Sequence, residues 1–571
     1  MTRKTAWLVA AGVAAVALGA AAVGAVALLV RGGAGRPSGE MFAGGGYLAI
    51  ELSGDMPEGP APVETLFESR PPSIRALVEA VDRAAHDRKV MGLLLRIKPL
   101  DTGWGRVQEL REALVRFKRS GKPSWAHLED ASNLEYFLAT GCSKIAASPT
   151  SLVDVSGLAA EVTFYRGTLD KLGVEAQFEG VGRYKNAPNQ LTETGFTEPH
   201  REQMNALVDS LFAQYVAGIA ESRGLADDAV RALVDQGPFR ASEAKQAGLV
   251  DELLYRDEVE ARVPGGSRLS VAPYVRAARG SAFDRRPRLA VVYAAGDLMP
   301  GQSQEGPFGR VAGADTIIQG LRAAREDASV RAIILRVDSP GGSGTASDAI
   351  WREVQLARRA KPVIASMGDY AASGGFYVAM GADAIVAQPG TITGSIGVFS
   401  GKLSLRGLYG KLGIGQETVS RGRNATLFSS YEPWTESERA KVRAMNVAFY
   451  DTFVSKAAEG RKKTEAEIEA VAQGRVWTGL EAMDGGLVDT LGGLDDAVRV
   501  ARERARIPAG QDVQLVVLPE SKGFFEALLE RQEDDVSVRV LGREAAALVR
   551  WGLSLSDRGP IARLPYELLV R

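Results

Sequence analysis

Short apolar runs alternate with amphipathic helical patterns along most of the chain. The runs GLLLRI from Gly92 and AIILRV from Ala332 have the length of buried strands, and a helical pattern such as that from Ala346 to Arg359 follows. This alternation is typical of stacked βαβ units around a largely parallel sheet. The chain is therefore predicted to be an α/β protein.

The whole pattern occurs twice, in residues 90–251 and again in residues 330–489. VMGLLLRIKP corresponds to VRAIILRVDSPGG, GKPSWA to AKPVIA, and YFLATGCSKIAASP to FYVAMGADAIVAQP. The offset hardly changes, since 387 − 147 = 240 for one alanine pair and 489 − 251 = 238 for the closing aspartates. Each copy ends in a predicted long helical stretch, Glu198 to Arg223 and Glu436 to Arg461. A period this long indicates duplicated domains rather than a solenoid, whose repeats are shorter.

The repeat sets the predicted domain limits. We expect one domain over residues 46–275, opening with the strand-like YLAIEL, and a second over 288–505, opening with LAVVYAAGDLMP. A basic, proline-containing linker, Arg276 to Arg288, separates them. Residues 506–571 form an extension of mixed strand and helix character without a readable motif.

The N-terminal segment is predicted to anchor the chain in a membrane. Ala6 to Val30 contains no charged residue, and as a helix it would be roughly 37 Å long, enough to cross a ~30 Å hydrocarbon core. Arg3 and Lys4 favour a cytoplasmic N-terminus, which would place residues 1–31 in and beside the membrane and the body on its far side. A cleaved signal peptide is the alternative, although its apolar region is usually shorter.

Composition gives no support for several classes of function. Lys plus Arg (69) balances Asp plus Glu (70), so no bulk field favours nucleic acid. The single cysteine, Cys142, excludes an intrachain disulfide and gives no support for a thiolate metal site. Three scattered histidines indicate neither a metal centre nor a Ser/His/Asp triad.

The two copies differ where chemistry would need them to differ. The second copy has Ser373 within Ala-Ala-Ser-Gly-Gly, where the first has Asn133, which cannot be a nucleophile. The first has Lys185 where the second has Arg423, and a guanidinium cannot lose its proton in a protein. We therefore infer one composite site, with a serine from one half and a lysine base from the other.

Glycines near this serine are candidates for binding an oxyanion. Gly341 and Gly342 follow an apolar strand in the second copy, where the first reads Lys98-Pro99-Leu100. Glycines at a strand-to-helix turn can leave backbone N–H groups uncovered, although the turn could equally bind phosphate or be a plain turn. Rival nucleophiles are Ser339, Ser343 and Ser395, of which Ser395 in TGSIG is the best placed.

Five motifs in this order resemble those of the long, two-domain signal peptide peptidases known as protease IV, which are bacterial Ser/Lys proteases. They are GRYKNA at 182–187, DSPGG at 338–342, SMGDYAASGGFYVA at 366–379, TITGSIGV at 391–398 and GRVWTG at 474–479. The resemblance covers residues 46 to about 505.

The resemblance implies a Clp/crotonase-like βαβ-spiral domain in each half. It further implies a homotetramer on the outer face of the cytoplasmic membrane that degrades hydrophobic signal peptides without a metal or cofactor. Carried over by motif, Ser373 is the nucleophile, Lys185 the general base, and the amides of Gly342 and Gly374 form the oxyanion hole. Whether lysine and serine meet within one chain or between chains is left open.

Two other classes of function fit parts of the pattern. A crotonase-type acyl-CoA enzyme would use the paired amides with a carboxylate base such as Asp369. A non-catalytic membrane scaffold would use the duplicated folds for oligomerisation alone.

Overall fold

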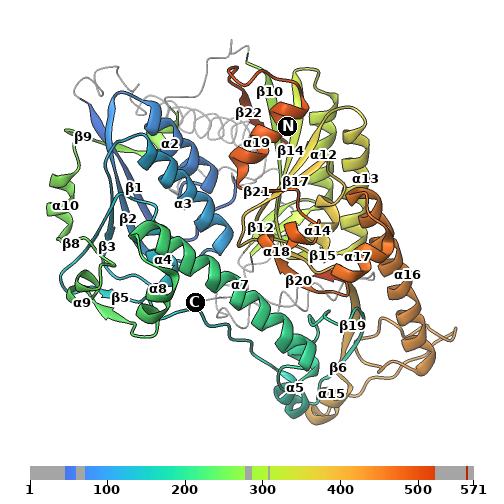
Figure 1. The fold of residues 1–571 in the computed structure, drawn as a ribbon. Helices are drawn as coiled ribbons and strands as arrows, with labels where there is room; N and C mark the ends of the chain where they lie inside the picture. Colours follow the sequence, from blue (N-terminus) through green and yellow to red (C-terminus); the bar gives the residue numbers. More distant parts are fainter. Residues whose placement is uncertain (1–44, 60–70, 277–285, 307–308, 521–560, 564–571) are drawn as a thin grey trace, which may run out of the picture.

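The computed structural model describes residues 45–59, 71–276, 286–306, 309–520 and 561–563. Figure 1 shows two α/β bodies side by side, the first half of the chain in blue to green and the second in yellow to red. The predicted anchor, residues 1–31, lies outside the described residues, as do most of the linker and most of the C-terminal extension. Among the helices that are described, none is both long and apolar enough to cross a membrane.

The sheet of the first half is parallel throughout. Its order is β8 (Glu252–Leu253), β4 (Lys144–Ala147), β3 (Ser124–Leu128), β2 (Val90–Leu100), β1 (Gly46–Gly54) and β9 (Ser267–Ser270). Alternate residues of β2 face opposite sides, so that Leu93 and Leu95 join the main core while Leu94 joins a smaller cluster with Val259 on the other face. Burial on both faces is what a parallel sheet requires, and it explains the near-continuous apolar runs.

The second half repeats this arrangement. Its eight-stranded sheet has the order β20 (Val476–Thr478), β18 (Ile392–Gly394), β16 (Val363–Ala372), β14 (Val330–Ser339), β10 (Arg288–Ala295) and β22 (Gln514–Val517). β17 (Ala384–Ala387) also pairs with β16, and β21 (Thr490–Leu491) pairs with β17, as β4 and β8 follow β3 in the first half. All these pairs are parallel except β18 with β20. Ile333 and Leu335 pack in the core with α12 (Ala314–Glu326) and α13 (Gly344–Arg358), while Ile334 packs with α19 (Leu494–Arg504).

The predicted α/β class and internal duplication are confirmed. β2 of the first half corresponds to β14 of the second, and α3 (Trp104–Arg119) corresponds to α13. The two long helices, α7 (Glu198–Arg223) and α16 (Glu436–Arg461), have the predicted limits. Beyond residue 506 the sequence showed no motif, yet β22 adds an edge strand to the second sheet there.

A third sheet joins the two halves. Its order is β12 (Gln304–Gly306), β13 (Gly309–Gly313), β11 (Asp297–Met299), β15 (Gly341–Ser343), β23 (Ile561–Arg563), β19 (Val398–Ser404) and β6 (Glu175–Val181). β6 belongs to the first half and pairs antiparallel with β19 of the second, from Val181 opposite Val398 to Glu175 opposite Ser404. The pair lies at the lower right of Figure 1, beneath the second body. It carries the chain that follows β6, including Lys185, into the second half.

Candidate active site

Ser373 stands at a sharp turn between a strand and a helix. β16 ends at Ala372 and α14 (Gly374–Ala379) begins at the next residue. The backbone of Ser373 has φ 55° and ψ −112°, a conformation that a non-glycine residue rarely adopts. Such strain persists only where the surrounding structure holds it, and it is concentrated at functional sites. The turn is fixed by the Ser373 amide, which donates to the Gly394 carbonyl at 2.8 Å.

Lys185 of the same chain reaches this turn. Its Nζ atom lies 2.7 Å from Ser373 Oγ, 3.0 Å from Ser395 Oγ and 3.2 Å from the Ser395 carbonyl oxygen. Lys185 is 6% exposed, and both serines are fully buried. The two halves of the sequence thus bring the predicted lysine and serine into direct contact.

The surroundings of Lys185 favour the neutral amine. Burial lowers the pKa of Lys185 well below its usual value, because a buried ammonium loses its hydration. A neutral amine has two N–H donors and one lone pair. The Ser395 carbonyl can only accept, so it takes one N–H, and Ser395 Oγ can take the other. The lone pair is then left for the hydroxyl proton of Ser373, which is the arrangement that a general base needs.

The loop that carries Lys185 is held by Gln473 and by the GRVWTG motif that follows it at 474–479, a motif without a predicted chemical role. The amide of Tyr184 donates to the Gln473 carbonyl at 2.7 Å, and the Arg183 amide donates to Gln473 Oε1 at 3.1 Å. A Cβ atom at Gly474 would lie 2.6 Å from the backbone nitrogen of Lys185, so only glycine permits this close approach. The adjoining Arg475 carbonyl accepts from the Ser395 amide at 2.7 Å. One motif therefore positions both the lysine and its serine partner.

The predicted glycines lie around Ser373. Gly342, in β15, stands opposite Leu298 of β11 and Ala562 of β23. Gly374 follows Ser373 directly, and a Cβ built on Gly341 would lie 2.8 Å from the Gly374 nitrogen. Gly341 is therefore the glycine that packs against the Gly374 amide. The sequence predicts it only as part of the turn.

The rival serines have other partners. Ser339 Oγ accepts from the Gly341 amide at 3.1 Å, and Ser343 Oγ accepts from Ala346 at 3.3 Å as the N-cap of α13. Ser395 also has a positive φ, 53°, and it shares the lysine with Ser373. The TGSIG motif predicts Ser395 as a rival nucleophile, whereas in the structure its hydroxyl is a hydrogen-bond partner of the lysine amine. Its unusual φ is a tertiary feature that no local pattern in the sequence indicates.

The equivalent positions in the other half have structural surroundings. Asn133 is buried, and its amide group donates to the Gly157 carbonyl at 2.9 Å and accepts from Tyr215 Oη at 3.0 Å. Arg423 is exposed on a turn. Neither position has the contact that joins Lys185 to Ser373.

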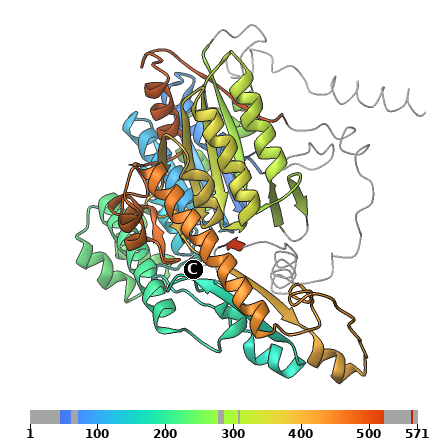
Figure 2. The same ribbon diagram turned by 90° about the vertical axis from the view of Figure 1, so that its right-hand side faces the viewer.

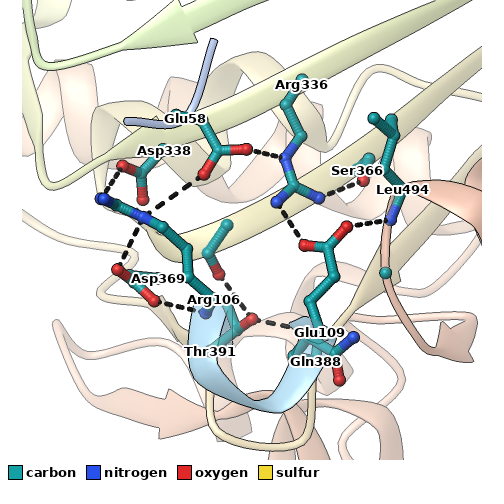
Figure 3. Close-up of polar contacts among 12 residues, drawn as sticks. Glu58, Arg106, Glu109, Arg336, Asp338, Ser366, Asp369, Gln388, Thr391 and Leu494 are labelled. Carbon is teal, nitrogen blue, oxygen red and sulfur yellow. Dashed lines mark hydrogen bonds and ion pairs between the residues drawn. The ribbon is translucent and has the colours of Figure 1, made fainter. Parts of the chain in front are cut away.

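A buried network of charges links the first half to the strands that end at the site (Figure 3). Arg106 of α3 binds Asp338 at 2.7 Å and Asp369 at 2.8 Å. Arg336 of β14 is fully buried and binds both Glu58 and Glu109, the latter at 2.6 Å. Because β14 leads into the glycine turn and β16 leads to Ser373, this network fixes the first half against the two strands that lead to the candidate active site.

The network carries more carboxylates than guanidinium groups. Burial raises the pKa of Glu58 to about 7, and burial likewise raises the pKa of Asp369. The Asp369 carboxylate accepts from the amides of Gly103, at 2.9 Å, and Arg106, at 2.7 Å. These bonds direct Asp369 toward the first half, so the base expected for a crotonase-type enzyme is engaged in holding the halves together.

Comparisons with known proteins agree with the duplicated fold. Residues 116–269 and 355–508 each match the model of peptidase family S49, and residues 310–389 match that of Clp protease. The chloroplastic serine protease SPPA of Arabidopsis thaliana is 36% identical over 458 residues, covering 78% of this chain and 68% of the relative. Protease 4 of Salmonella typhi is 34% identical over 454 residues, covering 76% of this chain and 72% of the relative.

Among solved structures, a membrane protease specific for a stomatin homolog from Pyrococcus horikoshii is similar to part of the chain. It is 17% identical, with a TM-score of 0.26, and the match covers 43% of this chain and 97% of that one. The Clp protease match and the two repeated S49 segments show a Clp protease-like fold.

Proposed function

The chain belongs to peptidase family S49 and is a serine peptidase, and from this premise we propose that it is a membrane-anchored endopeptidase that degrades released signal peptides with a Ser373/Lys185 dyad. The observation that carries the proposal is the 2.7 Å contact between the buried Lys185 amine and Ser373 Oγ. The family membership removes the acyl-CoA and scaffold alternatives that the sequence left open.

The proposed reaction is acyl transfer to serine. Ser373 Oγ attacks the scissile carbonyl carbon while neutral Lys185 accepts the hydroxyl proton. The oxyanion is bound by the backbone amides of Gly342 and Gly374, whose lack of side chains leaves room for it. Protonated Lys185 then donates its proton to the leaving amine. Water, activated by the same lysine, hydrolyses the acyl-enzyme.

Ser395 serves this reaction as a positioning residue. Its hydroxyl and carbonyl take the two N–H groups of the amine, which turns the lone pair toward Ser373. Ser373 rather than Ser395 is the proposed nucleophile, because Ser373 adjoins Gly374 and the glycine turn.

The direct test is turnover of a synthetic signal peptide by the purified full chain, followed by mass spectrometry. Ser373→Ala and Lys185→Ala should each lower kcat/KM by a factor of at least about 10², the range for loss of a general base or nucleophile. Arg423→Ala, at the exposed equivalent position, is the control and should keep wild-type turnover. Wild-type turnover in either dyad variant would reject the dyad.

The membrane location and the assembly rest on the sequence and on the family resemblance. Removal of residues 1–31 should move the protein from the membrane fraction to the soluble fraction if this segment is the anchor. A homotetramer is proposed for the detergent-solubilised chain and is tested by its mass from light scattering. The contact between Lys185 and Ser373 is made within one chain, which supports a dyad formed inside each chain. A mixture of Ser373→Ala and Lys185→Ala chains should then stay inactive, and recovered activity would show a dyad formed between chains.

A further inference from the structure

The long helix α7 of the first half packs against the GRVWTG motif of the second half. The Val476 amide donates to Gln203 Oε1 at 3.0 Å, and Ser210 Oγ lies 2.9 Å from Thr478 Oγ1. Both ribbon views place α7, in green, at the lower side of the second half (Figure 1 and Figure 2). One helix of the first half therefore holds the motif that positions the lysine loop.

Glu202 of α7 lies beside this motif, and its carboxylate has three partners. Tyr184 Oη donates to its two oxygens at 2.9 and 3.0 Å. Arg475 Nη1 donates to Oε1 at 2.9 Å, and the Arg183 guanidinium lies 3.6 Å from Oε2. The carboxylate thus joins the residue before Lys185 to the second residue of the GRVWTG motif.

The Arg475 side chain makes a second contact between the same two loops. Its guanidinium lies over the Tyr184 ring, 5.0 Å from the centroid, and over the Trp477 ring, 4.5 Å from the centroid. The negative face of an aromatic ring attracts such a cation. Glu202 aligns this stack, because it binds the phenol of Tyr184 and the guanidinium of Arg475. We refer to Glu202, Tyr184 and Arg475 as the α7 clamp.

The α7 clamp is connected to both sides of the lysine amine through the backbone. Tyr184 directly precedes Lys185 in the chain. The Arg475 carbonyl accepts from the Ser395 amide at 2.7 Å, and Ser395 in turn accepts from the lysine amine through its hydroxyl and its carbonyl. A shift of either loop therefore changes the distance between the lysine amine and its acceptors. A displacement of about 1 Å at a reacting group can lower turnover by about 10²-fold.

The α7 clamp lies outside the apolar core. The Glu202 side chain is 42% exposed, and that of Arg475 is 21% exposed. Ion pairs this exposed contribute little to the stability of a fold. The α7 clamp is therefore expected to set the geometry of the two loops rather than the free energy of unfolding.

We propose that Glu202 is a positioning residue of the peptidase, which through the α7 clamp keeps the Lys185 amine buried against Ser373. The inference rests on the proposed function, because it concerns the lysine of the proposed dyad. Burial is what lowers the pKa of Lys185. Loss of the α7 clamp loosens the two loops and lets water reach the amine, which raises this pKa toward its usual value.

The direction of the pH shift separates positioning from a direct effect of charge. Removal of a nearby negative charge alone lowers the pKa of a lysine, because the ammonium loses an opposite charge. Entry of water has the opposite effect on the pKa of Lys185. Glu202→Gln should therefore move the acid limb of the kcat/KM profile to higher pH if Glu202 holds the loops.

The experiment compares full-length chains by steady-state kinetics on the synthetic signal peptide. Glu202→Gln should lower kcat by about tenfold or more, with KM little changed, and should move the acid limb to higher pH. Tyr184→Phe should act in the same direction, and the double variant should lose no more than Glu202→Gln alone, since both changes break one contact. Asp209→Asn removes a carboxylate from an exposed position of the same helix and should keep the wild-type kcat and pH profile. Urea-induced unfolding should give similar midpoints for all of these chains.

The outcomes distinguish the inference from the proposed function. If wild type hydrolyses the peptide and Glu202→Gln keeps its kcat and acid limb, the inference is overturned and the proposed function stands. A lower kcat with an acid limb that is unmoved, or moved to lower pH, overturns the inference as well, because it indicates a structural or a direct charge effect. A wild-type chain that leaves the peptide intact removes the proposed function and the inference together.

Discussion

The two halves of the molecule share a fold and differ in what their equivalent positions do. Ser373 and Lys185 meet at 2.7 Å, whereas the equivalent Asn133 binds backbone and tyrosine partners and Arg423 lies on the surface. Each half supplies one member of the Ser373/Lys185 contact, and at the equivalent position of the other half stands a residue with a different chemistry. The comparison teaches that the site depends on the junction, where β6 of the first half pairs with β19 of the second.

A second pair of equivalent residues differs in its surroundings rather than in its identity. Arg96 and Arg336 occupy the same place in β2 and β14, 240 residues apart (336 − 96 = 240). The carboxylates that bind Arg96, Glu51 and Glu129, are 42% and 46% exposed. Those that bind Arg336, Glu58 and Glu109, are 3% and 4% exposed. Both arginines are thus buried, but the carboxylate partners of Arg96 lie at the surface, whereas those of Arg336 are buried between the halves.

Exchanging the two basic residues should give the largest effect. Lys185→Arg places a permanent cation against Ser373 and should lower kcat/KM by about 10²- to 10⁴-fold, the contribution of a general base. Arg423→Lys makes the reverse change on the surface and should leave kcat/KM at the wild-type value. Steady-state kinetics on the signal peptide measures both, and a Lys185→Arg chain with wild-type kcat/KM would contradict the role of Lys185 as base.

Removing each of the two equivalent arginines should lower the free energy of unfolding by different amounts. Arg336→Met leaves Glu58 and Glu109 buried without their cation, which costs about 3–5 kcal/mol for a broken buried pair. Arg96→Met leaves two exposed carboxylates, for which the cost is about 1 kcal/mol or less. Urea-induced unfolding of the two variants provides the comparison. Equal losses would show that the interface network adds nothing to the surface pair.

Ser395→Ala tests whether this serine positions the lysine. The lost hydroxyl should lower kcat by about tenfold, since the amine keeps only one of two hydrogen-bond acceptors besides Ser373. It should also move the acid limb of the kcat/KM profile to lower pH, because a protonated amine with fewer acceptors loses its proton more readily. A lower kcat with an unmoved limb would indicate a structural role only.

Glu58 should affect only the pH dependence of stability, without a change in turnover at a fixed pH. Because the folded pKa of Glu58, about 7, lies above its ordinary value of 4.5, the folded state binds more protons between these values. Its contribution to stability is full below pH 4.5 and is lost as the pH rises through 7. Glu58→Gln should remove this slope, at most about 1.4 kcal/mol per pH unit. Unfolding free energies at pH 5 and 7 measure it, and an unchanged slope would contradict the assignment.

The sequence indicated the fold through patterns that both copies share. It indicated the dyad through positions at which the copies differ. Short apolar runs located the strands, and helical patterns located α7 and α16, while the arginine at the equivalent position of the second copy marked Lys185 as unusual. The role of Gly474 and the position of Ser395 could not be predicted, since both depend on loops that meet only after folding. The strand at Ile561 was missed because three residues carry too little periodicity to be recognised.

The most direct test of a neutral lysine beside the serine is the rate at which a fluorophosphonate labels Ser373 as a function of pH. We predict that the wild-type rate rises through an apparent pKa well below the ~10.4 of a free lysine, and that Lys185→Met is labelled slowly without this limb. Rapid labelling of Lys185→Met with the wild-type pH dependence would contradict the account.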